Sequence, residues 1–216
     1  LDKYGGTILG GDCSKGENKI VSITALGNQG KLALRRYACR PGEVLLTSGY
    51  HGLSKLGFLL QNCEINGRKY NLSKTLIKDA IRTFCRPDIN FDLIHQIKAS
   101  NPMNYNYEIG CTDTSDGFYQ GVLDLANESK CKAIIDYKKL PKHSDWPVGS
   151  KWDEHYFFGG GDYQLLFSLP RDWADNLLKV ETNIYEIGYF SDGEPTVDVK
   201  NYPRGDFADI KLYSHF

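Results

Sequence analysis

The amino-acid sequence predicts a fold of the α/β or α+β class. Short apolar runs that resemble strands interleave with longer runs of helical periodicity along most of the chain. Hydrophobic residues make up 41% of the 216 residues and aromatic residues 12%, a composition that supports a packed core. The two common glycine-rich nucleotide loops, Gly-x-Gly-x-x-Gly and Gly-x-x-x-x-Gly-Lys-Ser/Thr, are absent, so any phosphate chemistry must use another device.

Strands are expected where apolar or alternating runs are bounded by glycine, proline or polar residues. Lys19–Leu26 alternates two sets of side chains, which is typical of a strand, and Val44–Ser48 is a continuous run of the kind that is buried on both faces. The other strand-like runs are Thr7–Leu9, Tyr105–Cys111, Ala133–Asp136, His155–Phe158, Tyr163–Leu169, Ile184–Phe190 and Thr196–Val199.

Helices are expected where apolar residues recur at helical spacing behind a capping residue. Asn71 or Ser73 can cap a helix over Lys74–Cys85, which stops before Arg86-Pro87 because the residue before proline avoids helical angles. Asn90 can cap a helix over Phe91–Ser100. Further helices are expected at Leu53–Cys63, Gly117–Glu128 and Pro170–Val180, and an irregular loop at Lys138–Lys151.

Two features concern the organisation of the chain. Leu1–Gly6 reads as the end of a helix closed by glycine, which indicates that an upstream portion is absent. The Gly27–Gly30 loop is a candidate domain boundary.

Charge and cysteine content exclude several classes of protein. Lysine and arginine total 26 and aspartate and glutamate 27, so the net charge of -1 predicts no nucleic-acid partner. Apolar runs are much shorter than a membrane span, and no signal peptide is evident, so no membrane partner is expected either. The six cysteines are scattered without a Cys-x-x-Cys pair, which favours reduced thiols in a cytoplasmic protein over a zinc site.

The segment Cys111–Gly117 is the strongest candidate for a functional site. It stands between a strand-like run and a helical run, where the backbone N–H groups of a helix start favour anionic oxygens. Asp113 and Asp116 would repel a bare phosphate, so a divalent cation is the natural mediator, and oxygen ligands suit Mg²⁺. The alternative is that Ser115 or Asp116 only caps the helix.

Two further loops share the same character. Gly10-Gly11-Asp12 and the segment Gly159–Asp162 also place aspartate beside glycine near a strand-like run. Glycine lets the backbone approach a ligand closely, and aspartate supplies a hard oxygen for a cation. Such residues are also common in turns, so composition alone does not separate the two interpretations.

The order of the motifs resembles that of thiamine-monophosphate kinases from Leu1 to Phe216. Gly10–Gly16, which reads Gly-Gly-Asp-Cys-Ser-Lys-Gly, is similar to their Gly-Gly-Asp-Thr-Ser/Thr-Arg-Gly motif. The family belongs to a superfamily of ATP-using synthetases that includes aminoimidazole ribonucleotide synthetase and selenophosphate synthetase. The resemblance implies the carboxy-terminal domain of that fold, a mixed sheet packed with helices. Other segments in the family's order are Ser22–Gly27, Arg36, Arg40–Glu43, Arg86-Pro87, Asp113–Gly117 and Tyr213–Phe216.

The resemblance also implies an activity, the phosphorylation of thiamine monophosphate to thiamine diphosphate with ATP and Mg²⁺. Phosphoryl transfer needs mainly positioning and charge neutralisation, which agrees with a site that has no evident nucleophile or base. No catalytic residue is therefore assigned. By resemblance, metal binding falls to Asp12, Asp113 and Asp116, ATP binding to Gly11, Asp12, Arg36 and Ser115, and substrate binding to Gly161 and Tyr213.

The resemblance further divides the chain into two parts. Residues 1–26 match the tail of the family's amino-terminal ATP-binding domain, and residues 27–216 match the complete carboxy-terminal synthetase-like domain. The remainder of the amino-terminal domain, which forms the dimer interface in the family, is missing. The full-length protein is therefore expected to be a homodimer, and this chain alone is expected to be inactive or nearly so.

One departure from the family keeps other functions open. Gly161 and Gln164 stand where the family has two glutamates, in Gly-Gly-Glu-Asp-Tyr-Glu, and the first of these contacts the substrate. The change permits a superfamily member that uses ATP on a different substrate. A catalytically inactive homologue that serves as a binding module is the other alternative, although the retention of Asp12, Asp113 and Asp116 argues against it.

Overall fold

The computed structural model describes residues 6–28, 30–102, 107–205 and 207. The chain divides into two compact units, Leu1–Gly30 and Lys31–Phe216, and each is described by itself.

The described part of the first unit contains neither a helix nor a strand. The apolar side chains of the two segments expected to be strands are exposed, with Ile20, Val21 and Ile23 each 85% accessible to solvent. The prediction of strands at Thr7–Leu9 and Lys19–Leu26 is therefore wrong for this structure. A strand needs a partner for its backbone N–H and C=O groups, and none pairs with these segments among the described residues. The helix end expected at Leu1–Gly6 lies, apart from Gly6, outside the described residues.

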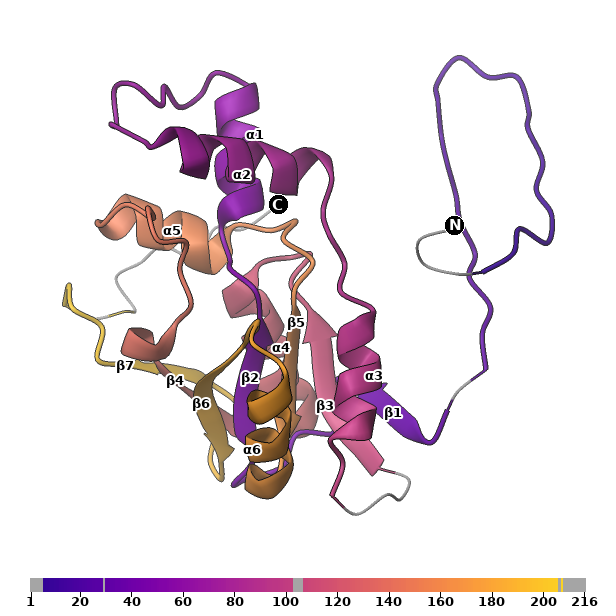
Figure 1. Cartoon of the computed structure of the whole chain (residues 1–216), viewed down its shortest axis with the longest axis vertical. Helices are drawn as coiled ribbons and strands as arrows, with labels where there is room; N and C mark the ends of the chain where they lie inside the picture. Colours follow the sequence, from indigo (N-terminus) through magenta and orange to yellow (C-terminus); the bar gives the residue numbers. More distant parts are fainter. Residues whose placement is uncertain (1–5, 29, 103–106, 206, 208–216) are drawn as a thin grey trace. The chain divides into compact units, whose positions relative to one another are not determined.

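The second unit is built on a seven-stranded mixed sheet with the order β1-β3-β5-β2-β6-β4-β7 (Figure 1). β1 and β3 are parallel, as are β4 and β7, and every other neighbouring pair is antiparallel. The strands are β1 (Leu32–Arg35), β2 (Val44–Ser48), β3 (Tyr107–Asp113), β4 (Lys132–Asp136), β5 (Leu165–Leu169), β6 (Ile184–Ser191) and β7 (Val197–Lys200).

Helices cover both faces of the sheet. α3 and α6 lie in front of it and α4 lies behind it, whereas α1 and α2 pack on each other beyond one end of the strands (Figure 1). The helices are α1 (Leu53–Gln61), α2 (Lys74–Cys85), α3 (Asp92–Ala99), α4 (Phe118–Ser129), α5 (Ser150–Phe158) and α6 (Arg171–Val180), with a short 3₁₀ helix at Tyr137–Lys139.

The central strand β2 separates the two hydrophobic cores. Every residue of β2 is buried, which confirms the strand expected at Val44–Ser48. Successive side chains of a strand point to opposite faces of the sheet. Leu46 accordingly packs in the core with Trp173 of α6, and Leu45 packs in the core with Val122 of α4.

The helix termini expected from the sequence are largely confirmed. Ser73 caps α2, since its Oγ accepts a hydrogen bond from the Leu76 N–H at 3.0 Å. Asn90 Oδ1 accepts the Leu93 N–H at 3.2 Å at the start of α3.

One strand-like run is a helix instead. His155–Phe158 is the last turn of α5, which begins within the segment expected to be an irregular loop. Trp152, Tyr156 and Phe157 are buried in α5 at helical spacing, so packing overrides the strand propensity of the aromatic residues.

The described residues give two findings on the class of protein. No helix among them combines the length and the apolar character that a membrane crossing requires. All six cysteines carry free thiols, and burial raises the pKa of Cys39 and of Cys111 to about 12. These two side chains therefore remain neutral thiols at physiological pH.

A polar pair is buried beneath the end of β2. Thr47 Oγ1 and His51 Nε2 lie 2.7 Å apart, and the His51 ring packs against Phe118 with the centroids 4.7 Å apart. Burial lowers the pKa of His51 to about 3, because an imidazolium there would lose its hydration. His51 is therefore neutral in the folded protein.

This burial predicts acid sensitivity. The unfolded chain binds a proton at His51 below about pH 6.5, but the folded chain does not bind it until about pH 3, so stability falls as the pH falls through this range. We expect the free energy of unfolding to lose about 1.4 kcal/mol per pH unit from this residue. Urea unfolding of His51→Gln should show a weaker pH dependence than the wild type between pH 4 and 6.5. His95→Gln, at an exposed position on α3, should keep the wild-type dependence.

Candidate functional site

Three loops meet at one end of the sheet because of the strand directions. β5 is antiparallel to both β3 and β2. The loops that follow β2 and β3 therefore lie at the same end as the loop that precedes β5. This end carries the Gly49–Gly52 turn, the Asp113–Gly117 loop and the glycine-rich loop 159–164.

The Asp113–Gly117 loop joins a strand to the start of a helix, as expected. Asp113 is the last residue of β3, and Gly117 is the N-cap residue of α4, with a φ of 106°. No side chain caps α4, so the interpretation of Ser115 or Asp116 as its cap is wrong. The uncapped N-terminus is an electrostatically favourable place for an anion.

The two carboxylates of this loop suit a hard cation. Asp113 is half-buried and Asp116 is exposed. The described residues contain no group of three or more histidine, cysteine, aspartate or glutamate side chains arranged to hold a metal ion alone. Mg²⁺ is often held by one or two carboxylates together with phosphate oxygens, so the donor set present fits Mg²⁺ bound with a phosphate ligand.

The glycine-rich loop packs directly on the Asp113–Gly117 loop through the backbone. The Gly161 N–H donates to the Ser115 carbonyl at 2.8 Å, and the Thr114 N–H donates to the Gln164 carbonyl at 2.9 Å. The Gln164 N–H in turn donates to Thr114 Oγ1 at 3.0 Å. These bonds fix the position of Ser115 relative to the loop that precedes β5.

Gly161 has a conformation that favours glycine. Its φ is +87°, and a Cβ atom added there would lie 2.7 Å from Ser54 Oγ. A residue with a side chain would therefore meet both backbone strain and a close contact with α1. The loop brings Gly161 beside Ser115, but its role in binding substrate stays a prediction.

Asp162 has a different role from the one its loop suggested. The sequence interpretation offered it as a hard oxygen for a cation, but its side chain is only 1% exposed. Its Oδ2 accepts the Gly52 N–H at 2.6 Å and its Oδ1 accepts the Ser54 N–H at 2.8 Å. Burial raises the pKa of Asp162 to about 7, while the backbone N–H donors oppose that shift. The sequence offered no signal for this contact because Asp162 and Gly52 are 110 residues apart.

Arg36 directly follows β1, which ends beside Gly110 of β3, and the Arg36 carbonyl accepts a hydrogen bond from Ser129 Oγ at the end of α4. Its Nε donates to Thr112 Oγ1 at 3.1 Å, which places the arginine beside the residue that precedes Asp113. Arg36 is largely exposed, so its guanidinium group can reach an anionic ligand. The structure therefore brings together Asp113, Ser115, Asp116 and Gly161 among the residues expected to form the site, and Arg36 reaches the residue before Asp113 through its side chain.

The remaining site residues are not placed with this group. Gly11 and Asp12 belong to the first unit, where both are exposed and Asp12 Oδ1 accepts the Cys13 N–H at 2.9 Å. Tyr213 lies outside the described residues.

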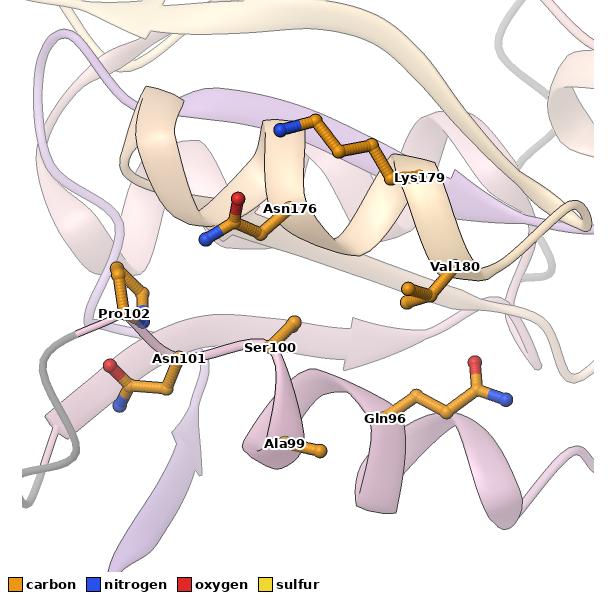
Figure 2. Close-up of a pocket in the computed structure, with 8 residues that line it drawn as sticks. All are labelled: Gln96, Ala99, Ser100, Asn101, Pro102, Asn176, Lys179 and Val180. Atoms are coloured by element: carbon orange, nitrogen blue, oxygen red, sulfur yellow. The ribbon is translucent and has the colours of Figure 1, made fainter.

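A cavity lies elsewhere on the second unit. It has a volume of about 590 Å³ and lies between α3 and α6, with Asn176, Lys179 and Val180 of α6 among its lining residues (Figure 2). It contains none of the residues expected at the site. Its lining is Gln96, Ala99, Ser100, Asn101, Pro102, Asn176, Lys179 and Val180.

Comparison with known proteins gives the relationships of the chain. No family model matches it. A thiamine-monophosphate kinase from Prochlorococcus marinus is 39% identical over 216 residues, which is 100% of this chain and 65% of that protein. A thiamine-monophosphate kinase from Synechococcus elongatus is 28% identical over 220 residues, with the same two coverages. Over its whole length, this chain is related to the thiamine-monophosphate kinases.

Solved structures share the fold of most of this chain. The structure of AaThiL complexed with AMPPCP and TMP is 25% identical, with a TM-score of 0.61 over 85% of this chain and 54% of that chain. The thiamine-monophosphate kinase from Stenotrophomonas maltophilia K279a is 23% identical, with a TM-score of 0.62 over 77% of this chain and 52% of that chain. A HypE–HypF complex matches with a TM-score of 0.58 at 16% identity, over 78% of this chain and 53% of that chain. The expected aminoimidazole ribonucleotide synthetase-like fold, with its mixed sheet, is confirmed.

The comparisons also give the extent of the match. The chain spans about 65% of the length of the two kinases it matches from Prochlorococcus and Synechococcus.

Removing either carboxylate of the Asp113–Gly117 loop should affect Mg²⁺ binding and the stability of the fold in different ways. We expect Asp113→Asn and Asp116→Asn each to weaken Mg²⁺ binding. Without Mg²⁺, the free energy of unfolding of both variants should equal or slightly exceed that of the wild type, because residues that serve function are often not the most stable choice at their positions. Chemical unfolding with and without Mg²⁺ measures both effects, since a ligand at 100 times its Kd stabilises by about 2.7 kcal/mol.

Asp192→Asn removes an exposed carboxylate in the turn after β6 and serves as the control. It should retain the full stabilisation by Mg²⁺. Equal stabilisation of the control and of both loop variants would contradict the assignment of Asp113 and Asp116.

Proposed function

We propose that the protein containing this chain transfers the γ-phosphoryl group of ATP to thiamine monophosphate and so forms thiamine diphosphate. The observation that carries the proposal is the meeting of the Asp113–Gly117 loop and the glycine-rich loop 159–164 at one end of the sheet, with Arg36 Nε bonded to the neighbouring Thr112. The similarity of the whole chain to thiamine-monophosphate kinases supports it. A neighbouring structure that carries AMPPCP and TMP supports the same pair of substrate classes.

The chain's own residues bind and orient in this proposal. Asp113 and Asp116 would hold Mg²⁺, with Asp12 as a further ligand by resemblance to the family, and the uncapped start of α4 would favour phosphate oxygens. Bound Mg²⁺ neutralises charge on the phosphates. No side chain is required as nucleophile or base, because phosphoryl transfer depends on alignment and charge neutralisation.

The remaining residues contact the two substrates in this proposal. Ser115 and Arg36 bind ATP together with Gly11, and the guanidinium group of Arg36 suits phosphate oxygens. Gly161 and Tyr213 contact the thiamine moiety, and the aromatic ring of Tyr213 suits a cationic heterocycle.

In this proposal the active protein is a cytoplasmic homodimer. Residues 1–26 belong to its amino-terminal ATP-binding domain, and residues 27–216 form its carboxy-terminal domain. These 216 residues alone have little or no activity, since they span about 65% of the matched kinases.

The test supplies the portion of a matched kinase that this chain does not cover. We expect the chain, joined to the portion of the Prochlorococcus relative that it does not match, to form thiamine diphosphate from thiamine monophosphate, ATP and Mg²⁺. The 216 residues alone should show little or no turnover under the same conditions. The Arg36→Ala form of the joined protein should have a raised KM for ATP, measured by coupled assay. ATP binding without product would reject thiamine monophosphate as the substrate, and failure to bind ATP would favour a non-catalytic binding module.

Gly161 favours a second candidate, an ATP-dependent phosphoryl transfer to another phosphorylated heterocycle. Thiamine carries a positive charge, and a glycine at this position offers no carboxylate to pair with it. Turnover of the joined protein with a panel of phosphorylated heterocycles separates the two substrates. A preference for a neutral heterocycle would support this second candidate.

The conformation of Gly161 also predicts a stability effect. We expect Gly161→Glu and Gly161→Ala to lower the free energy of unfolding by a similar amount, about 1–2 kcal/mol, because a Cβ atom at φ +87° is the common cause. Adding Ser54→Ala should recover part of the loss, since it removes the Oγ atom closest to the new Cβ. Urea unfolding of the single and double variants measures the coupling energy between residue 161 and Ser54. A large difference between the Ala and Glu variants would instead indicate that charge dominates.

A further inference from the structure

The buried Asp162 side chain caps a helix that has no cap of its own. α1 begins after Gly52, which has a left-handed conformation and no side chain to accept a hydrogen bond, and the first turn of α1 contains no acidic residue. Asp162 supplies both missing functions from the glycine-rich loop, since its two oxygens accept the N–H groups of Gly52 and Ser54. The start of α1 and the glycine-rich loop are therefore held together by one carboxylate.

The neighbours of Asp162 in the chain extend this connection to the Asp113–Gly117 loop. On one side, the Gly161 N–H binds the Ser115 carbonyl. On the other side, Gln164 exchanges two hydrogen bonds with Thr114 through its backbone. The Gln164 side chain strengthens the connection, since Nε2 donates to the Asp162 carbonyl at 3.1 Å and Oε1 accepts from Ser48 Oγ at 3.0 Å.

We propose that Asp162 is a positioning residue for the Asp113–Gly117 loop. It is buried, and it acts by fixing the glycine-rich loop to the start of α1. The glycine-rich loop then fixes the backbone of Ser115, between the two carboxylates. The identity of the cation that this loop binds rests on the function proposed above, but the mechanical connection does not.

A cap that served only stability would behave differently. Loss of such a cap would lower the free energy of unfolding without changing the loop after β3. Loss of a positioning residue would also loosen Thr114–Gly117, which does not contact Asp162 through any described hydrogen bond. Ser73 provides the matched comparison, because it caps the neighbouring helix α2 and its described hydrogen bonds, to Leu76 and Asp145, do not involve the loops at the candidate site.

Hydrogen–deuterium exchange on the 216-residue chain tests the connection without any ligand. We expect Asp162→Ala to accelerate exchange both at residues 52–54 and at residues 113–117. Asp162→Asn keeps an oxygen but turns an amide N–H₂ toward an N–H donor, so it should cause a smaller acceleration at the same two places. Ser73→Ala should accelerate exchange only at the start of α2. Wild-type exchange at 113–117 in both Asp162 variants would overturn the proposal.

Mg²⁺ titration supplies the second readout, at a temperature where melting curves show all variants to be folded. Residues that hold metal ligands in position without touching the metal typically contribute about 10–100-fold to metal affinity. We therefore expect Asp162→Asn to weaken Mg²⁺ binding by a factor in this range and Ser73→Ala to leave it unchanged. Unchanged Mg²⁺ affinity in Asp162→Asn would overturn the positioning role. A wild-type chain that bound no Mg²⁺ would count against the proposed metal site, whereas the exchange result would still decide the mechanical connection.

Discussion

The candidate site depends on the antiparallel pairing of β3 with β5. The register places Asp113 opposite Leu165, so the loop after β3 and the loop before β5 start from adjacent residues of the sheet. A shift of one residue would turn every β5 side chain to the other face and move Leu166 and Phe167 out of their separate cores. The burial of these two side chains therefore also fixes the position of the functional loops.

The loops at this end of the sheet are held by hydrogen bonds that do not use the Asp113 and Asp116 side chains. Backbone hydrogen bonds from Gly161 and Thr114 and the enclosed carboxylate of Asp162 hold the framework, while Asp113 and Asp116 remain partly or fully exposed. This division has a physical advantage, because a carboxylate engaged in an internal ion pair would bind a cation less well. Phosphoryl transfer relies on alignment and charge neutralisation, which a rigid frame with exposed carboxylates can supply.

Local sequence determined most helices, the central strand and the main functional motif. The sequence predicts the bounds of helix α2, with Asn71 or Ser73 as its cap, because apolar periodicity, a capping residue and a following proline are all local signals. The strand Val44–Ser48 followed from a short apolar run between turn residues. The Asp113–Gly117 loop was placed correctly between strand and helix, since that position also follows from neighbouring residues.

Only the tertiary structure decided which loops meet and what each aspartate does. Asp162 resembles Asp113 in sequence context, yet burial against the start of α1 makes it a backbone acceptor rather than a surface ligand. His155–Phe158 forms part of a helix because its aromatic side chains fill a core. Lys19–Leu26 forms no strand, because a strand depends on partners that its own sequence does not specify. The sequence by itself determined the helices, strands and turns that depend on neighbouring residues. Tertiary packing decided which loops meet and which side chains are buried, because both depend on contacts between residues that are far apart in the chain.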